Sequence, residues 1–357
     1  MKLPKTINSG EWTEGHVQGI AVDTKKGYIY YSFTTILLKT DLMGNPIGSA
    51  ERLAGHLGCI TFNEDDGKVY GSLELKHDVI GRGIINRTGW NPSTEDSFYL
   101  VCFDVDKIIK MNMDSEKDGI MTAVYLKDVV SDYEAIDEVS GAKHRYGCSG
   151  IDGTAYGPVF GADPASPKKF MVAYGIYSDI ERKDNDYQVI LQYDPSVFEK
   201  YGKPLCQETP HHSGPDSAEE RYFLYTGNTT YGIQNIEYDA FCGNWFIAVY
   251  TGKKDAFTNF HMFVCDGSVA PIEQELIGRA DEKGLVLTLK QIGVKSDKND
   301  IYGSDFLLGS TGIASIGDGY FYISKPYERR DDSGHYLGSL VSLYKLDQSD
   351  PMLFKLA

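Results

Sequence analysis

Short runs of alternating apolar and polar residues recur along the whole chain, separated by turn sequences rich in Gly, Asp and Asn. The runs are rich in Ile, Val, Tyr and Phe, and apolar residues at helical spacing are nearly absent. Alternation with a period of two is typical of β-strands that bury one face, and Gly or Asn in the turns permits the positive φ of tight hairpins. The pattern therefore predicts an all-β fold.

One short pattern occurs five times and marks the expected first strand of five sheets. The copies align on one isoleucine each: GHVQGIAVD on Ile20, GHLGCITFN on Ile60, YGCSGIDGT on Ile151, YGIQNIEYD on Ile236 and GSTGIASIG on Ile313. Each copy is followed by a turn and by further strand-like runs, which gives four antiparallel strands per repeat. Four-stranded sheets repeated around an axis define a β-propeller, and a β-sandwich gives no reason for such a repeat. We expect a five-bladed β-propeller.

We expect one domain over residues 1–357, with blades at approximately 16–55, 56–140, 147–228, 232–294 and 310–357. The fourth strands are the least regular, and LVLTLKQIG is the expected fourth strand of the fourth blade. The segment KLPKTI near the N-terminus either adds to the outer strand of the last blade or replaces it. The sequence leaves this choice open.

Composition and charge restrict the partners. The formal net charge of −16 disfavours a nucleic acid, because binding a polyanion relies on a basic surface. No apolar run approaches the ~20 residues of a membrane span. The six cysteines lie far apart without a CxxC pair, as expected of thiols in a reducing compartment. We expect a cytoplasmic protein, or a secreted one if a leader has been removed, of undetermined oligomeric state.

The topology of a blade predicts where a ligand would bind. The starts of the innermost strands and the loops between second and third strands lie at one end of the axis, where propellers hold ligands. The rim differs from blade to blade, which favours one central site over five equivalent ones. The candidate ligand-binding residues are His16, Gln18, His56, Lys76, His77, Tyr146, Ser149, Tyr231, Gln234, Asn235, Lys325 and Arg329.

Lysines and arginines are frequent in the second-to-third-strand loops of this acidic chain. A basic funnel would attract an anionic ligand, although such residues also serve simply to keep long loops hydrated. The expected partner is a small molecule, either a saccharide or an anionic metabolite.

Three carboxylates are candidate catalytic residues: Glu74, Asp152 and Glu237. Cleavage of a glycosidic bond requires an acid and a base or nucleophile. In blade count and in the rim positions of Asp152 and Glu237 the chain resembles the five-bladed glycosidases, and the resemblance implies glycoside-hydrolase-like chemistry. Ala21 and Thr61 stand at the equivalent positions of the first two blades, where that resemblance implies a carboxylate. The alternative is a non-catalytic propeller that binds a sugar or a protein.

A metal ion is a further possibility at the rim. His16 and His56 could converge with a carboxylate on zinc, manganese or iron, but no HxH or HxxxH spacing supports them, and each could instead donate a hydrogen bond to a neighbouring blade. Calcium on the axis, as in the five-bladed calcium-activated nucleotidases, is a variant whose motifs are not matched here. The sequence therefore assigns no metal ligands and leaves the cofactor undetermined.

Overall fold

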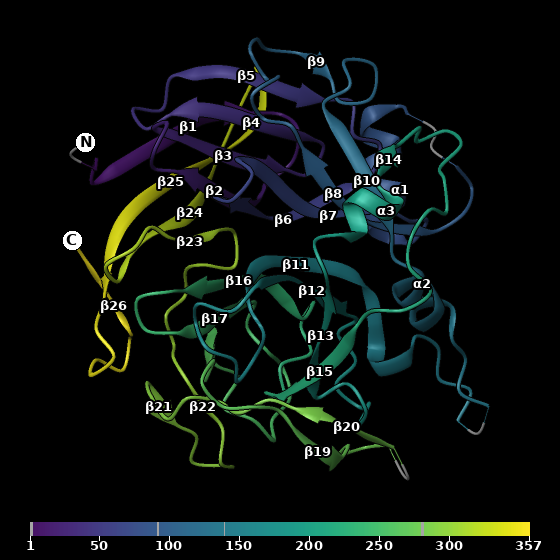
Figure 1. Ribbon diagram of the computed structural model, residues 1–357, viewed down its shortest axis with the longest axis vertical. Coiled ribbons are helices and arrows are strands. Elements are labelled where there is room, and N and C mark those ends of the chain that lie inside the picture. Colours follow the sequence, from purple (N-terminus) through teal and green to yellow (C-terminus); the bar gives the residue numbers. More distant parts are fainter. Residues whose placement is uncertain (1–2, 91–92, 139, 280–281) are drawn as a thin grey trace.

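The computed structural model describes residues 3–90, 93–138, 140–279 and 282–357. Five sheets surround a common axis (Figure 1), which confirms the predicted five-bladed β-propeller. The innermost strands begin near the five predicted starts. Residues 91–92 and 139 of the second predicted blade, residues 280–281 of the fourth, and Lys2 of the KLPKTI segment lie outside the described residues.

The first two blades follow the expected strand order, and each gains a short outer strand from elsewhere in the chain. The first blade contains β2 (Val17–Asp23), β3 (Tyr28–Phe33), β4 (Ile36–Asp41) and β5 (Pro46–Glu51), with β9 (Met113–Asp114) parallel to β5. The second contains β6 (His56–Asn63), β7 (Lys68–Leu75), β8 (Ser97–Phe103) and β10 (Met121–Tyr125), with β14 (Lys203–Pro204) at the edge. Helix α1 (Val79–Thr88) connects β7 to β8.

The third blade is the widest sheet. It contains β11 (Cys148–Pro158), β12 (Lys168–Ile176), β13 (Tyr187–Tyr193) and β15 (Glu220–Tyr225), extended by β20 (Lys283–Val286) and β19 (Ile272–Glu275). Helix α2 (Lys127–Glu134) and the short turn η1 (Arg145–Gly147) precede β11, and α3 (Val197–Tyr201) follows β13. Strand β20 runs parallel to β15.

The fourth blade corrects one expectation. Within the described residues its sheet contains only β16 (Ile233–Asp239), β17 (Asn244–Val249) and β18 (Met262–Cys265). The expected fourth strand LVLTLKQIG divides: Leu285 and Val286 pair with β15 of the third blade, and Leu289 makes an isolated bridge to Cys265. Leu287 is buried in the core between the two blades, so the segment crosses from one sheet edge to the other. The sequence predicted a strand of the fourth blade here, whereas the strand that forms joins the edge of the third blade.

The two chain ends close the ring on the same strand. The fifth blade contains β23 (Ile313–Ser315), β24 (Tyr320–Asp331), β25 (Gly334–Leu346), β1 (Thr6–Trp12) and β26 (Phe354–Leu356), and a separate small hairpin joins β21 (Val294–Lys295) to β22 (Tyr302–Gly303). Strand β1 pairs with the first part of β25 and β26 with its end. The N-terminal strand therefore adds to the last blade without replacing its C-terminal strand.

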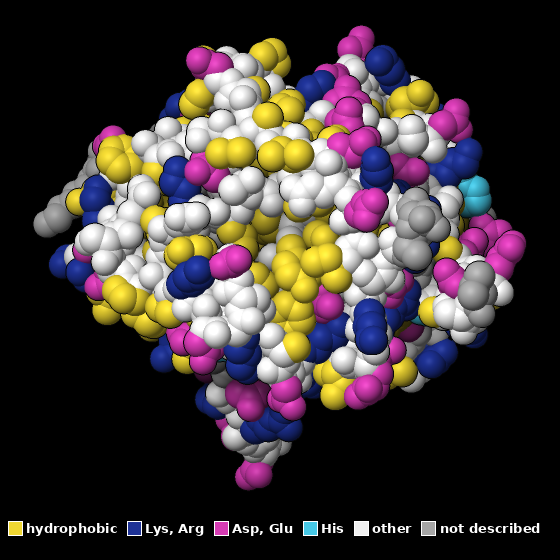
Figure 2. Space-filling view, turned by 90° about the horizontal axis from the view of Figure 1, so that it is seen from below, with side chains coloured by type: hydrophobic (Ala, Val, Ile, Leu, Met, Phe, Trp, Pro, Cys, Tyr) yellow, Lys and Arg dark blue, Asp and Glu magenta, His cyan; other side chains and the backbone are white. Residues whose placement is uncertain are grey.

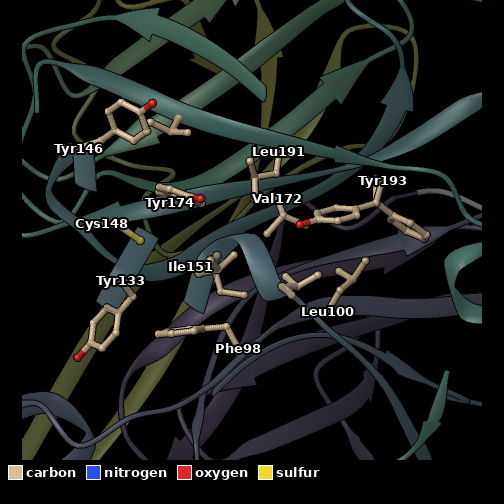
Figure 3. Packing of buried hydrophobic residues seen from close by; sticks show 14 of the residues in the cluster. Phe98, Leu100, Tyr133, Tyr146, Cys148, Ile151, Val172, Tyr174, Leu191 and Tyr193 are labelled. Atoms are coloured by element: carbon tan, nitrogen blue, oxygen red, sulfur yellow. The ribbon is translucent and has the colours of Figure 1, made fainter. Parts of the chain in front are cut away.

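The core lies between neighbouring blades. Figure 3 shows one such layer, in which Phe98 and Leu100 of the second blade pack against Ile151, Val172 and Tyr174 of the third. Around the axis the innermost strands approach closely where glycine stands directly before the repeated isoleucine, as it does in the first, third and fifth blades. A Cβ on Gly19 would lie 2.9 Å from the amide nitrogen of Ile60, so the repeat preserves backbone contact between blades.

On the side of the molecule seen in Figure 2, acidic and basic side chains are interspersed, without one large basic patch. Among the described residues, no helix has both the length and the apolar character that crossing a membrane requires.

Candidate functional site

A cavity of ≈ 430 Å³ opens among the starts of the innermost strands of blades one to four. It is lined by His16, Gln18, His56, Glu74, Lys76, Ile80, Ser149, Asp152, Tyr231, Gln234 and Tyr250. Nine of these residues are among the predicted candidates. The central location expected from the repeat therefore coincides with a cavity of the size that small ligands occupy.

Irregular pairing near the mouth orients several lining side chains. The pairing register shifts between Val17 and Gly19 in β2, around Asp152 in β11, and between Ile233 and Asn235 in β16. The residues at these shifts include Gln18, Asp152 and Gln234. An extra residue in one strand of a pair bends the strand and redirects its side chain, which explains how these polar groups reach the cavity.

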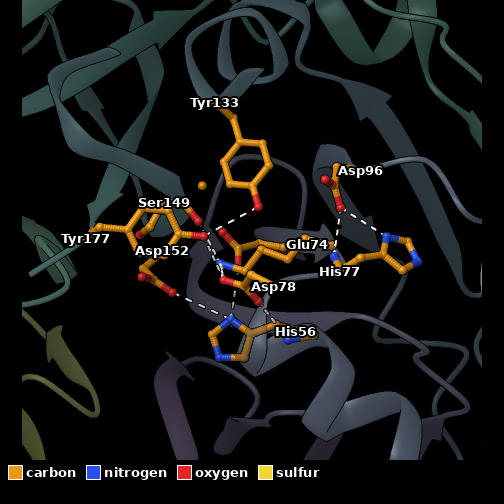
Figure 4. A network of polar contacts seen from close by, with 12 residues as sticks. His56, Glu74, His77, Asp78, Asp96, Tyr133, Ser149, Asp152 and Tyr177 are labelled. Carbon is orange, nitrogen blue, oxygen red and sulfur yellow. Dashed lines mark hydrogen bonds and ion pairs between the residues drawn. The ribbon is translucent and has the colours of Figure 1, made fainter. Parts of the chain in front are cut away.

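Four ionisable side chains form the wall of the cavity between the second and third blades. His56 lies directly opposite Glu74 in the β6–β7 pairing. The Nδ1 atom of His56 is 3.5 Å from Oε2 of Glu74 and 3.6 Å from Oδ1 of Asp152 (Figure 4). The ammonium group of Lys76 is 2.8 Å from Oε2 of Glu74 and donates a hydrogen bond of 2.6 Å to the carbonyl of Ser149. We name His56, Glu74, Lys76 and Asp152 the charged cluster.

The second oxygen of each carboxylate in the charged cluster is held by a separate donor. The backbone N–H of Ile151 donates to Oε1 of Glu74 at 2.6 Å, and Nε2 of Gln234 donates to Oδ2 of Asp152 at 3.2 Å. Glycine at position 150 makes the first of these contacts possible, since its φ is +120° and a Cβ there would overlap Oε1 of Glu74. The orientation of both carboxylates is therefore fixed by the backbone and by a neighbouring blade.

A chain of polar contacts continues from the charged cluster toward the third blade. Lys76 Nζ lies 3.6 Å from Oδ2 of Asp78, which caps helix α1 by accepting from the N–H of Gly81 at 2.9 Å. The hydroxyl of Tyr177 donates to the same Asp78 oxygen at 2.9 Å and lies 3.4 Å from the hydroxyl of Tyr133 (Figure 4). These contacts fix Lys76 and the start of α1 relative to both blades.

Burial and charge shift the ionisation of these groups. Burial opposes the charged form of Glu74, but Lys76 and His56 outweigh it and lower the pKa of Glu74 below its ordinary value. Burial and the neighbouring charge of Glu74 raise the pKa of Asp152 to about 6. Burial would lower the pKa of Lys76, but Glu74, Asp78 and Asp152 raise it overall. Burial, with His56 and Arg87, lowers the pKa of His16 to about 4, so His16 is uncharged at neutral pH.

The opposite wall is neutral and partly aromatic. Nε2 of Gln18 lies 3.0 Å from Nε2 of His16. Tyr231 is 44% exposed, and its ring meets that of Tyr250 edge-on with the centroids 6.1 Å apart. Asn235 supports this wall from behind, because its Nδ2 donates to the carbonyls of Gln18 and Ser310 and so connects three blades. The wall presents amide groups and ring surfaces to a ligand.

Several predicted site residues lie apart from the cavity. Glu237 accepts a hydrogen bond of 2.8 Å from the N–H of Ser315 between blades four and five. His77 pairs through Nδ1 with Asp96 at 3.0 Å. Tyr146 is buried among the guanidinium groups of Arg145, Arg221 and Arg279.

The remaining two predicted residues, Lys325 and Arg329, lie on an extension of the fifth blade. Strands β24 and β25 stay paired up to Asp331 and Gly334, so the expected loop is a long hairpin on which Arg329 pairs with Glu11. Two other basic side chains in loops between second and third strands also have local partners: Lys254 is 2.6 Å from Asp186, and Arg182 pairs with Asp184.

Two lining residues, Ile80 and Tyr250, were not predicted. Ile80 lies in α1, and Asp78 three residues before Gly81 is a helix-capping signal from which this helix could have been predicted. Tyr250 directly follows β17, at the same end of the blade as the other candidates. Both positions add apolar surface to a polar cavity.

No model of a known protein family matches the chain, and no curated protein matches it. Solved structures with a similar arrangement include a functionally unknown protein from Desulfotomaculum acetoxidans, with 10% identity, 97% of this chain and 70% of that chain covered, and a TM-score of 0.37. Hsv2 from Kluyvelomyces marxianus has 9% identity and a TM-score of 0.26, and the match covers 93% of this chain and 99% of that chain. A protein of unknown function from Bacteroides caccae has 9% identity and a TM-score of 0.30, and the match covers 76% of this chain and 81% of that chain. Sequence identities and TM-scores this low do not indicate a function for this chain.

Fold and site together define a class: a five-bladed β-propeller with one asymmetric central cavity and a buried charged cluster in its wall.

Proposed function

We propose that this propeller binds a small saccharide in its central cavity and hydrolyses a glycosidic bond there. The observation that carries the proposal is the convergence of two carboxylates, Glu74 and Asp152, from adjacent blades on one cavity, with one oxygen of each within 4.8 Å of the other. Paired carboxylates are the usual means of cleaving such a bond. The spacing is shorter than the roughly 6.5–9.5 Å between the carboxyl groups of inverting glycosidases. In those enzymes the wider gap leaves room for a water molecule.

The rest of the cavity suits a saccharide. Its volume of ≈ 430 Å³ is in the range for small ligands, and Gln18, Gln234 and Ser149 offer hydrogen-bonding groups for hydroxyls. The rings of Tyr231 and Tyr250 provide apolar faces of the kind on which sugar rings stack. Because carboxyl groups outnumber ammonium groups in this wall, a neutral saccharide is favoured over an anionic one.

Binding and hydrolysis are tested separately. Binding is measured as a shift of the melting temperature with a panel of neutral, amino and acidic mono- and disaccharides, and hydrolysis with chromogenic glycosides of the same sugars. Asp152→Asn is expected to reduce turnover at least a hundredfold while the melting shift with the bound sugar persists.

Asp186→Asn is the matched control, because Asp186 is also a buried carboxylate paired with a lysine but does not line the cavity. It should retain turnover. If no sugar shifts the melting temperature and no glycoside is cleaved, the proposal is wrong. A melting shift without any turnover would instead make the protein a sugar-binding propeller.

A further inference from the structure

His56 has an unusual environment for an imidazole that is only 12% exposed. Its Nδ1 atom is buried and has no hydrogen-bond partner, although two carboxylate oxygens lie 3.5 and 3.6 Å away. These distances exceed the roughly 2.7–3.2 Å of N–H···O hydrogen bonds. A buried polar atom without a partner in a native fold requires an explanation, and an absent ligand is one of them.

The two carboxylates direct their remaining oxygens toward this atom. Oε1 of Glu74 and Oδ2 of Asp152 are held by Ile151 and Gln234, as described above, which leaves Oε2 and Oδ1 on the side of His56. Donors that hold the outer oxygen of a carboxylate are typical of the surroundings of metal ligands. The three facing atoms, Nδ1, Oε2 and Oδ1, all lie within 4.8 Å of one another, and they form the one such group found among the described residues.

The spacing and the charge both match a cation. Ligands at the ~2.0–2.2 Å typical of zinc lie about 3.4 Å apart at the corners of a tetrahedron, close to the two distances measured from His56. Around the group, three carboxyl groups, those of Glu74, Asp78 and Asp152, face a single ammonium group, that of Lys76. A divalent ion would offset this surplus of negative charge.

We infer that His56, Glu74 and Asp152 bind a divalent transition-metal ion of the Zn²⁺ or Mn²⁺ kind at the wall of the central cavity. Imidazole and carboxylate together suit these ions, whereas Ca²⁺ requires six to eight oxygen ligands. Because all three residues line the cavity, three protein ligands leave a coordination position open to water or to a substrate oxygen. Oε2 of Glu74 also accepts from Lys76, so the ion and the ammonium group share that oxygen.

The ion would occupy Oε2 of Glu74 and Oδ1 of Asp152, so in the metal-bound protein it would supply Lewis-acid chemistry in place of a free carboxylate pair. The inference rests on the proposed function for that use of the ion alone. The test therefore measures metal binding without sugar. The full chain is treated with EDTA, dialysed, and titrated calorimetrically with ZnCl₂ and MnCl₂, with CaCl₂ as the comparison. We expect one Zn²⁺ or Mn²⁺ per chain and a clear preference of both ions over Ca²⁺.

Two variants test the ligands and one tests specificity. His56→Gln and Asp152→Asn are each expected to weaken Zn²⁺ binding at least tenfold. His261→Gln is the matched control: Nδ1 of His261 is also buried without a hydrogen-bond partner, but it faces one carboxylate, that of Asp305, at 3.8 Å. His261→Gln should bind Zn²⁺ as the parent protein does.

A measurement on the parent protein guards against variants that fail to fold. Co²⁺ at a four-coordinate site gives strong visible absorption, which Zn²⁺ should abolish by displacement. The inference is overturned if the stripped protein binds neither Zn²⁺ nor Mn²⁺ at 1:1 stoichiometry, or if His56→Gln and Asp152→Asn fold and bind Zn²⁺ unchanged. Metal binding without sugar binding would overturn the proposed function alone, and sugar binding with turnover by a protein that binds neither Zn²⁺ nor Mn²⁺ would overturn the inference alone.

Discussion

Gln234 and Asp152 lie at irregularities in neighbouring innermost strands, and Nε2 of Gln234 donates to Oδ2 of Asp152 at 3.2 Å. A residue of the fourth blade thus orients a carboxylate of the third. If Asp152 is a metal ligand, Gln234→Leu removes the donor that orients it, and Zn²⁺ affinity should fall by about 10–100-fold. The measurement is the same calorimetric titration.

Gln192→Leu provides the comparison for this prediction, because Gln192 donates to Glu219 away from the cavity. It should leave Zn²⁺ affinity unchanged. Equal affinities of the parent and Gln234→Leu proteins would show that Gln234 does not orient the site.

Lys76 is the single ammonium group in the charged cluster, and its side chain is only 5% exposed. Lys76→Met would leave the buried Glu74 without its cation, and removing one partner of a buried ion pair costs about 3–5 kcal/mol. We expect the free energy of unfolding in urea to fall by this amount. Lys127→Met, which breaks the exposed pair with Asp216, should change it by less than about 1 kcal/mol. Equal effects of the two substitutions would contradict the buried pairing.

Gly150 stands where a side chain has no room. Its φ of +120° is unfavourable for other residues, and a Cβ there would overlap Glu74. Gly150→Ala should therefore displace the Glu74 carboxylate and lower the melting temperature. Gly83→Ala in helix α1 meets no atom within 4 Å and should be neutral or slightly stabilising. Comparable melting temperatures for both variants would count against the close approach at Gly150.

The repeat explains why the location of the cavity could be predicted from sequence. Ile20, Ile60, Ile151, Ile236 and Ile313 all lie on innermost strands, so residues just before them had to meet near the axis. Which of those residues face the cavity depends on the irregular pairing around Gln18, Asp152 and Gln234, and alternation alone does not reveal an extra residue in a strand.

Glu237 and Arg329 illustrate what the sequence did not contain. Glu237 is one residue after the repeated isoleucine, as Asp152 is. It follows the irregularity in β16, in the regularly paired part of the strand, and accepts a hydrogen bond from Ser315 instead of reaching the cavity. Arg329 lies within β24, where a loop was expected, because β24 and β25 remain paired for the length of the hairpin. Strand length and register are set by contacts between distant segments, which one sequence does not display.

Glu237 should make the stability of the protein depend on pH. Burial raises the pKa of Glu237 to about 8 from an ordinary value of 4.5. The folded state therefore keeps a proton that the unfolded state releases at lower pH, so this contribution to stability is complete below about pH 4.5 and is lost as the pH rises to 8. Within that window the slope is at most about 1.4 kcal/mol per pH unit.

Glu237→Gln tests this dependence, because the amide oxygen of glutamine can still accept from the N–H of Ser315. The variant should gain stability over the parent protein at pH 8 relative to pH 5 in urea unfolding. Parallel stability curves for the two proteins between pH 5 and pH 8 would show that Glu237 does not titrate in this range.

Closure of the ring by both chain ends predicts an asymmetry between two apolar residues. Ile7 on β1 is 1% exposed and packs in the core between the fifth and first blades, whereas Leu356 on β26 is 71% exposed. Ile7→Ala should lower the free energy of unfolding by about 2–5 kcal/mol, because it leaves a cavity where the ring closes. Leu356→Ala should change it by less than about 0.5 kcal/mol. Urea unfolding of both variants checks this, and a small effect of Ile7→Ala would mean that β1 is not needed to hold the last blade to the first.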